Sequence, residues 1–379
     1  RRVQLRAAEG IDLLSVLNPR SQANSKSLSP SPTAIHQTAN TQPALFSIQY
    51  ALTQLWQSWG IQPEGLLGHS IGEYAMACTA GIFSLEDAIR LVVARGQLMQ
   101  GLPAGGGMLA VMSTPEQILP LLPLGVELAA INGPDNMVVS GALTALDALA
   151  SDLENNGIRV TPLKVSHAFH SALMEPMLAE FEQVARSIQY ALPTLAIFSS
   201  VSGQQITDDM SQADYWVEQI RQPMRFQQAI ETLAADGYQQ FVEIGPKPSL
   251  LAMARACLPQ QSATWLPSLR KTRISDDSEV SVYPDWKTML SSLGQLYELG
   301  SDIDWAGFDR AYPRRLVSVP NYPFQHQRYW QDTEPVETLS GVFSVSASTV
   351  SSDTDRRDSH PLLGRSLAIA ADRILGFES

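Results

Sequence analysis

Ser70 is the strongest candidate for a nucleophile, because it lies between two glycines in the stretch GHSIG at residues 68–72. The preceding residues EGLLGHS predict a short strand, and the following residues IGEYAMACTAGIF predict a helix. A serine at such a sharp turn adopts strained dihedral angles, and small neighbours relieve the crowding. Its hydroxyl is exposed there, and the N–H of Ile71 at the helix N-terminus can stabilise an oxyanion. The pattern predicts acyl chemistry at Ser70.

A nucleophilic serine needs a general base, and the chain offers six histidines as candidates. They are His36, His69, His167, His170, His326 and His360. The first and last lie in predicted loops or linkers, and His326 lies in an extended tail. His69 adjoins the serine, but neighbours on a strand point to opposite faces. Elimination leaves His167 and His170, in VSHAFHSALM, and the residues alone do not choose between them.

The elements around these residues predict an α/β fold. Residues 20–42, rich in Ser, Pro, Asn and Thr, are typical of a surface loop, and helical spacing follows over 43–60, ending at Gly60. A second helix over 84–101 begins with Ser84 as N-cap and Asp87 at the capping-box position. Further along, LAIFSSV and QQFVEIG are predicted strands with the helix FQQAIETLAADG between them. That order predicts a parallel pairing.

A change of pattern near residue 106 predicts an inserted subdomain. Successive segments give strand, helix, strand, turn, strand, helix and strand: GGGMLAVM, STPEQILPLL, LAAINGPDNMVVSG, ALTALDALASDLENNG and RVTPLKV. This order is typical of a ferredoxin-like unit, which we place at 107–172. The expected fold is a hydrolase-like parallel-sheet subdomain, made of residues 1–106 and 173–280, that carries this insert.

The C-terminal part is less regular. Residues 283–300 predict one helix, and the aromatic-, arginine- and proline-rich run 304–330 is expected to be extended, so that 281–330 form a linker. Residues 331–358, rich in Ser, Thr and Asp, predict a flexible linker. Apolar residues return in SHPLLGRS within 359–379.

Composition excludes several classes of protein. The 379 residues are 44% hydrophobic and 17% charged, as in a soluble globular protein, and no apolar run reaches the roughly 20 residues that span a bilayer. A formal net charge of −12 argues against nucleic-acid binding. Two cysteines, without a signal-peptide pattern, favour a reducing cytoplasm. The chain begins without Met and stops in mid-pattern, which is typical of a piece of a longer polypeptide.

Seven sequence blocks occur in an order that resembles a known enzyme family. They are TQPALFSIQYALTQLW, GHSIGEY, ARGQLMQG, NGPDNMVVSG, HAFHSALMEPM, EQIRQPMRF and VEIGPKPSLL. The order resembles malonyl-CoA:acyl-carrier-protein transacylases, and most closely the acyltransferase domains of modular type I polyketide synthases, over about residues 10–270. YPRRLVSVPNYPFQHQRYW resembles the linker that follows such domains, and SHPLLGRS resembles the beginning of a dehydratase domain.

The resemblance implies roles for individual residues. Ser70 is the nucleophile, and His170, followed by SALM, matches the catalytic histidine better than His167 does. Arg95 matches the arginine that binds the free carboxylate of a malonyl group, which suits a planar guanidinium. The family orients its histidine through a main-chain carbonyl, here matched by Gln219. Gln42 matches a further pocket position, or else caps the helix after it.

The resemblance also implies a substrate and partners. GHSIGEY and HAFH resemble malonyl-selective members, which assigns His69 and Phe169 to substrate binding, with Phe169 excluding a methyl branch. The substrate is then malonyl-CoA and the acceptor is the phosphopantetheine thiol of an acyl carrier protein. Ketosynthase and dehydratase domains of the same polypeptide are expected neighbours. No bound cofactor or metal is expected in this region.

One departure from the family pattern and two rival interpretations stand beside this prediction. The family begins with a strand and a glycine- and glutamine-rich turn that supplies a second oxyanion donor, and this chain contains no such turn. We therefore expect slow acylation by the chain alone.

A serine esterase or thioesterase would need an acid, for which Asp87 and Asp135 are poor candidates. A non-catalytic docking module would leave Ser70, His170 and Arg95 without a purpose.

Overall fold

The computed structural model describes residues 34–270, 284–315, 317–318, 320–326, 365–368 and 375–378. The chain divides into one compact unit that ends at Arg315 and a second unit, Leu316–Ser379. In the second unit, β10 (Arg365–Ala368) and β11 (Leu375–Glu378) pair antiparallel. The predicted linker 331–358 lies outside the described residues, and the beginning of a dehydratase domain at 359–379 stays a prediction.

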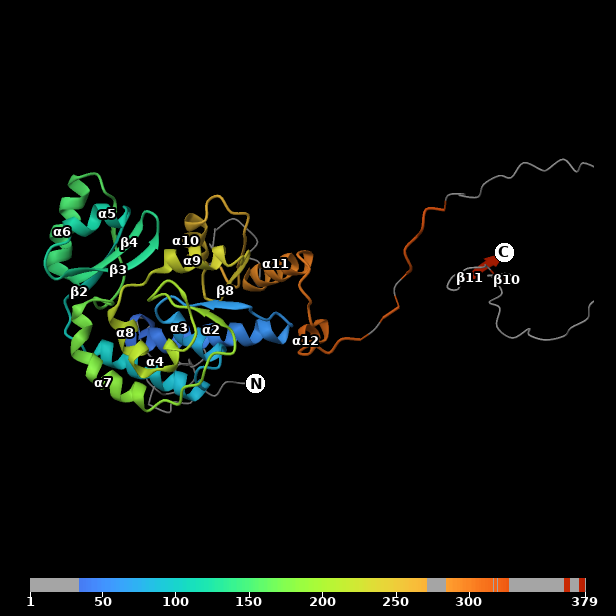
Figure 1. Cartoon of the computed structure of the whole chain (residues 1–379), viewed down its shortest axis with the longest axis horizontal. Coiled ribbons are helices and arrows are strands. Elements are labelled where there is room, and N and C mark those ends of the chain that lie inside the picture. Colours follow the sequence, from blue (N-terminus) through green and yellow to red (C-terminus); the bar gives the residue numbers. More distant parts are fainter. Residues whose placement is uncertain are drawn as a thin grey trace, which may run out of the picture. The chain divides into compact units, whose positions relative to one another are not determined.

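The larger part of the first unit contains two short sheets (Figure 1). In one, β1 (Gly65–Leu67) pairs parallel with β6 (Ala196–Phe198), which pairs antiparallel with β7 (Gln205–Ile206). In the other, β8 (Gln240–Glu243) pairs parallel with β9 (Thr264–Pro267). The predicted pairing of LAIFSSV with QQFVEIG is therefore wrong for the described strands. Both edges of β6 are already occupied, by β1 and β7, so β8 pairs elsewhere.

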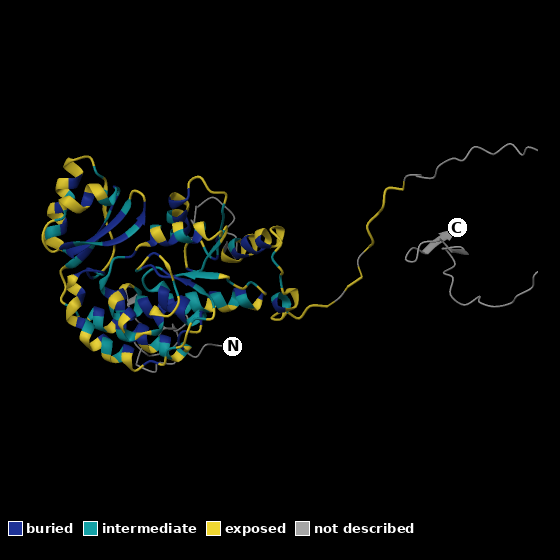
Figure 2. Cartoon of the chain, in the orientation of Figure 1, coloured by how far each residue is buried: buried dark blue, intermediate teal, exposed yellow. Residues whose placement is uncertain are grey.

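Helices cover these sheets and bury apolar clusters between them. Their bounds are α2 (Thr38–Ser58), α3 (Gly72–Thr79), α4 (Leu85–Gln100), α7 (Glu175–Arg186), α8 (Ala213–Arg221), α9 (Phe226–Ala235) and α10 (Ser249–Cys257), with single 3₁₀ turns at Ala34–His36, Leu119–Leu121, Ala172–Met174 and Asp209–Ser211. In Figure 2 the inward faces of these helices are buried and the outward faces are exposed. The core between them includes Tyr74, Leu91, Phe181 and Trp216.

The two helices that frame the candidate site begin for different reasons. α4 begins as predicted, because the Ser84 hydroxyl accepts a hydrogen bond from the Asp87 N–H at 3.1 Å. α2 begins at Thr38, inside the stretch predicted to be loop, with Pro43 in its interior. The N–H of Thr38 donates to Oε1 of Gln100 in α4 at 2.8 Å. This contact between distant residues satisfies an otherwise free N–H of the first turn, which local composition cannot reveal.

The inserted subdomain has the predicted ferredoxin-like arrangement. Its elements are β2 (Gly106–Val111), α5 (Pro115–Ile118), β3 (Val126–Gly133), β4 (Asn136–Ala142), α6 (Leu143–Asn155) and β5 (Val160–Pro162). The sheet order is β3-β4-β2-β5, with every pair antiparallel. In Figure 1, α5 and α6 lie over the sheet. Leu109, Val139 and Leu146 belong to the separate core that this subdomain buries.

Two C-terminal helices form a separate apolar cluster with the C-terminal part of α2. They are α11 (Pro284–Glu298), as predicted, and α12 (Trp305–Asp309), which replaces the beginning of the run predicted to be extended. α12 forms because Asp304 caps it by accepting from the Gly307 N–H at 2.8 Å. The ring of Trp59 lies 5.9 Å from that of Trp286 and 5.3 Å from that of Phe308. None of the helices in the described residues is long and apolar enough to cross a membrane.

Candidate active site

Ser70 and His170 come together although they are 100 positions apart in the chain. Ser70 Oγ lies 3.0 Å from His170 Nε2. In the described part of the chain they are the two non-glycine residues with positive φ, 50° for Ser70 and 57° for His170. Such backbone costs about 1–3 kcal/mol per residue and persists only where the surroundings enforce it. The strain is therefore concentrated on the two groups that form the hydrogen bond.

The turn around Ser70 depends on Gly68. A Cβ at this position would overlap the backbone of Glu73, because the end of β1 crosses the first turn of α3 at close range. The N–H groups of Gly72 and Glu73 donate back to the carbonyls of His69 and Ser70. Ile71 is the N-cap of α3, so its N–H has no carbonyl one helical turn earlier to bind. Its predicted role as oxyanion donor agrees with this position.

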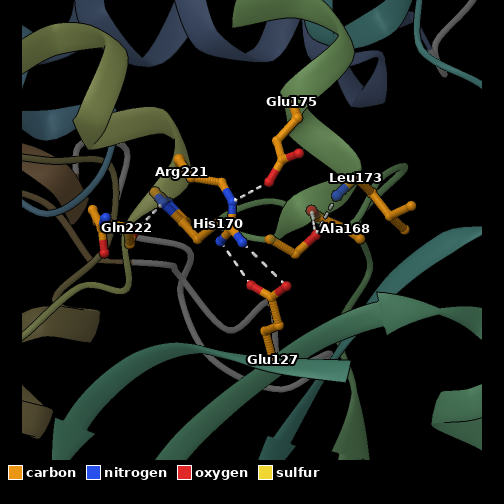
Figure 3. Close-up of polar contacts among 8 residues, drawn as sticks. Glu127, Ala168, His170, Leu173, Glu175, Arg221 and Gln222 are labelled. Carbon is orange, nitrogen blue, oxygen red and sulfur yellow. Dashed lines mark hydrogen bonds and ion pairs between the residues drawn. The ribbon is translucent and has the colours of Figure 1, made fainter. Parts of the chain in front are cut away.

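The main carbonyl at His170 Nδ1 belongs to Gln222, and the backbone of Gln219, the expected position, makes a weaker contact with the same ring. His170 Nδ1 lies 3.0 Å from the Gln222 carbonyl oxygen, as Figure 3 shows. Because a carbonyl only accepts, Nδ1 carries the proton and Nε2 presents its lone pair to Ser70. Gln222 is the C-cap residue of α8 and has an extended backbone, so its carbonyl points out of the helix. The side chain of Gln219 instead donates from Nε2 to the Ser70 carbonyl at 2.9 Å, and holds the turn itself.

His170 is kept neutral by its surroundings. Burial, the nearby Arg95 guanidinium and His69 lower the pKa of His170 to about 3, against weaker opposing hydrogen bonds from the Gln222 and Gln219 backbone. A neutral imidazole with its lone pair on the serine is the form that a general base requires.

Arg95 lies buried beside the serine, 2% exposed, and not on a solvated helix face. Its Nη1 donates to Gln42 Oε1 at 2.6 Å, and its Nη2 donates to Ser70 Oγ at 3.4 Å. Nε has no hydrogen-bond partner, and no carboxylate forms an ion pair with Arg95 among the described residues. Burial lowers the pKa of Arg95, while Tyr74 and Glu73 oppose that shift. A buried cation without a counter-ion next to a nucleophile can bind an anionic group of a substrate.

Gln42 lies inside α2, whose N-cap is Gln37, so the alternative that Gln42 caps the helix is wrong. Its side chain is 6% exposed and bridges Arg95 to Met99 Sδ, at 3.1 Å from Nε2. Gln42 therefore positions the guanidinium rather than the helix.

Comparison with known proteins decides the family. The family described as "Acyl transferase domain" matches residues 3–282. The chain belongs to this family. More narrowly, it is an acyltransferase domain of the modular type I polyketide synthase kind.

Three relatives illustrate the range of similarity. Mycoketide-CoA synthase of Mycobacterium tuberculosis is 41% identical over 314 residues, which are 83% of this chain and 7% of that protein. The crystal structure of the acyltransferase domain from the second module of the salinomycin polyketide synthase is 38% identical, with a TM-score of 0.69, covering 81% of this chain and 73% of that one. An acyl carrier protein S-malonyltransferase from Vibrio cholerae is 29% identical, with a TM-score of 0.58, covering 62% and 80%. The chain thus spans a small part of the large synthase that it resembles.

Two of the remaining predicted site residues of this acyltransferase domain, His69 and Phe169, directly precede Ser70 and His170 in the chain. His69 Nε2 lies 2.8 Å from Asn132 Oδ1 of β3, and burial lowers the pKa of His69. Phe169 is half-buried against the main core. The rejected base, His167, has its Nε2 3.2 Å from the Leu102 carbonyl oxygen, so it is anchored to the backbone and not to the serine.

Sequence reasoning missed Glu73, a carboxylate of α3 that is fully buried. Its Oε1 accepts from the Ser200 N–H at 2.8 Å, the Ser200 hydroxyl at 2.9 Å and the Tyr215 hydroxyl at 3.1 Å. Burial raises the pKa of Glu73 to about 7. Glu73 thus ties the helix after the nucleophile to the loop that follows β6 and to α8. A lone acid in an otherwise apolar helix segment is the signal that could have revealed it.

The acids that an esterase would need lie elsewhere in this acyltransferase domain. Asp87 donates its N–H to the Ser84 cap of α4 and pairs with Arg90 at 3.5 Å, and Asp135 is exposed in the turn between β3 and β4. The position that such an acid would occupy, next to His170 Nδ1, is taken by the Gln222 carbonyl. This arrangement disfavours a Ser-His-Asp hydrolase.

Proposed function

We propose that this domain transfers an acyl group from acyl-CoA, through an ester on Ser70, to the phosphopantetheine thiol of an acyl carrier protein. The observation that carries the proposal is the 3.0 Å contact between Ser70 Oγ and the neutral His170 Nε2, with Nη2 of Arg95 3.4 Å from the same oxygen. The named activity of the Vibrio cholerae relative, an acyl carrier protein S-malonyltransferase, supports the same reaction.

The reaction proceeds in two half-reactions. His170 Nε2 takes the proton of Ser70 as Oγ attacks the thioester carbonyl, and the Ile71 N–H stabilises the oxyanion. The tetrahedral intermediate collapses, the proton passes from His170 to the leaving CoA thiolate, and an acyl-serine remains. In the second half-reaction His170 takes the proton of the carrier thiol, whose sulfur attacks the ester carbonyl. The proton then returns to the Ser70 oxygen.

The acyl group is malonyl in this proposal. Arg95 is a buried cation, so an acyl group with a free carboxylate supplies the missing counter-ion. In this proposal His69 and Phe169 line the acyl pocket, and the bulk of Phe169 opposes an α-methyl branch. Exclusion of one methyl group is worth about 1–3 kcal/mol, so competition between malonyl-CoA and methylmalonyl-CoA should favour malonyl by roughly 10- to 200-fold. A preference for methylmalonyl would contradict the role of Phe169.

Intact-mass measurement after mixing with malonyl-CoA tests the core of the proposal. A mass increase of one malonyl group is expected on the wild-type chain and not on Ser70→Ala or His170→Ala. His167→Ala is the matched control, because His167 is a neighbouring buried histidine bound to the Leu102 carbonyl. Labelling of Ser70→Ala at the wild-type rate would end the proposal, as would faster hydrolysis of neutral esters than malonyl transfer.

The chain made alone is proposed to acylate slowly. Strands β1 and β8 belong to separate sheets in the described part, and both line a groove of about 1220 Å³. The sequence contains no match for the turn that supplies a second oxyanion donor in the family, and loss of one oxyanion donor typically lowers the rate by about 10²–10³. Ketosynthase and dehydratase neighbours, a partner carrier protein and a cytoplasmic location belong to the same proposal. Fast stoichiometric labelling of the isolated chain would contradict slow acylation.

A further inference from the structure

Arg221 is the last residue of α8 and bridges two elements that meet beside the active site. Its guanidinium binds Glu127 of β3 with two contacts, Nη1 to Oε2 at 2.7 Å and Nη2 to Oε1 at 3.1 Å. Its Nε donates to Glu175 Oε1, at the first residue of α7, at 3.1 Å. Figure 3 shows these contacts next to the hydrogen bond between His170 and Gln222.

The two ends of that hydrogen bond both lie next to the Arg221 contacts. The acceptor, the Gln222 carbonyl, directly follows Arg221 in the chain. The donor, His170, precedes Glu175 by five residues. Ser171, the N-cap of the 3₁₀ turn that leads to Glu175, donates its hydroxyl to the Ala168 carbonyl at 2.7 Å and accepts from the Leu173 N–H at 3.3 Å. Arg221 therefore connects the segment of the acceptor to the segment of the donor.

The inserted subdomain is attached at the same place. The N–H of Met224 donates to the Ala129 carbonyl at 2.9 Å, and the N–H of Ile131 donates to the Met224 carbonyl at 2.8 Å. Met224 is fully buried against Ala129 and Ala130 of β3. The segment after α8 is thus bound to β3 by Arg221 on one side of Gln222 and by Met224 on the other.

His170 has no carboxylate at Nδ1 and is oriented by a backbone carbonyl. The orientation of the ring therefore depends on how firmly the segment that carries this carbonyl is held in place. We propose that Arg221, together with Glu127 and Glu175, is a positioning group that fixes the Gln222 carbonyl against His170 and so selects the proton on Nδ1. Arg221 does not touch the reacting atoms. Its bidentate contact with Glu127 suits this task, because a planar guanidinium fixes the direction of the contact as well as its distance.

This inference rests on the proposed acyl transfer for its kinetic readout only. Arg221→Gln is expected to lower the single-turnover rate of Ser70 acylation at saturating malonyl-CoA by about 10- to 100-fold, the cost typical of a misplaced catalytic group. The Kd for malonyl-CoA should remain unchanged. Arg186→Gln is the matched control, since Arg186 also contacts two carboxylates, Glu182 at 2.6 Å and Asp214 at 3.0 Å, but not the His170 segment. It should acylate at the wild-type rate.

A structural readout separates positioning from simple destabilisation. In the full chain labelled with ¹⁵N-histidine, the His170 signal, assigned by its loss in His170→Ala, should report Nδ1–H in the wild type. In Arg221→Gln it should shift toward the Nε2–H form. Acylation at the wild-type rate, or slower acylation with an unchanged His170 tautomer, would overturn the inference.

Two further measurements cover the cases in which Arg221→Gln does not fold or the wild-type chain does not acylate. If Arg221→Gln does not fold, Glu127→Gln replaces it, because this change leaves the contact with Glu175 in place. It should shift the tautomer and rate in the same direction by a smaller factor, and a wild-type tautomer in it would refute the proposal. If the wild-type chain does not acylate at all, the proposed function fails, while the tautomer of His170 still tests the role of Arg221.

Discussion

Replacement of Arg95 by Ala should abolish the proposed preference of this domain for acyl groups that carry a carboxylate. The guanidinium is 2% exposed, has no counter-ion among the described residues, and lies 3.4 Å from Ser70 Oγ. Each charge-assisted hydrogen bond to a malonyl carboxylate contributes about 1.5–3 kcal/mol, and a carboxylate left buried without its partner loses about 3–5 kcal/mol. At 1.36 kcal/mol for each factor of ten, kcat/KM for malonyl-CoA should fall by about 10²- to 10⁴-fold.

Acetyl-CoA provides the internal reference, because it lacks the carboxylate but has the same thioester and CoA. Arg95 also lowers the pKa of His170, so the substitution changes a property of the enzyme that both substrates experience. The ratio of the two kcat/KM values cancels that shared effect and isolates carboxylate recognition. In Arg95→Ala the ratio should approach one, and in Arg95→Lys it should be intermediate, because an ammonium is a point charge without the planar fork.

The assay is the rate of acyl-serine formation by quench flow and intact mass. Arg90→Ala is the control, since Arg90 lies on the same helix but is half-exposed and paired with Asp87. It should leave the ratio unchanged. An equal loss of rate with malonyl-CoA and acetyl-CoA in Arg95→Ala would refute the assignment of Arg95 as the carboxylate receptor.

Three further predictions concern the base, the turn and a helix end. Burial and Arg95 lower the pKa of His170 to about 3, so the imidazole stays neutral as the pH falls. The value of kcat/KM should therefore not decrease around pH 6.5, the ordinary pKa of histidine. A decrease with its midpoint there would contradict the lowered pKa of His170. Gly68→Ala should lower the free energy of unfolding in urea by about 1–3 kcal/mol or more, because the new methyl group overlaps the backbone of Glu73. Gly294→Ala, at a helix position with open space around it, should be neutral or stabilising. Equal effects of the two substitutions would argue against the close approach at Gly68. Ser84→Ala should cost about 1 kcal/mol through loss of the α4 cap, and an unchanged unfolding midpoint would show that the cap does not contribute.

The sequence by itself determined the features that depend on neighbours within a few residues. The Ser70 turn, the Ser84 cap and the order of elements in the inserted subdomain were all predicted, because glycine spacing, capping and hydrophobic period act over one strand or one helical turn. The family followed from the order of seven blocks along the chain.

Only the tertiary structure decided which residues meet. The residues alone left His167 and His170 as equal candidates, and the fold brought His170 to the serine while it anchored His167 to a carbonyl. It also made Gln222, ahead of the expected Gln219, the main carbonyl at His170 Nδ1, since the place where α8 ends sets which carbonyl is free. The burial of Arg95 and the separate pairing of β6 and β8 likewise depend on contacts between segments far apart in the chain. Local sequence patterns do not predict such contacts, because close packing of the interior depends on many side chains from distant segments at once.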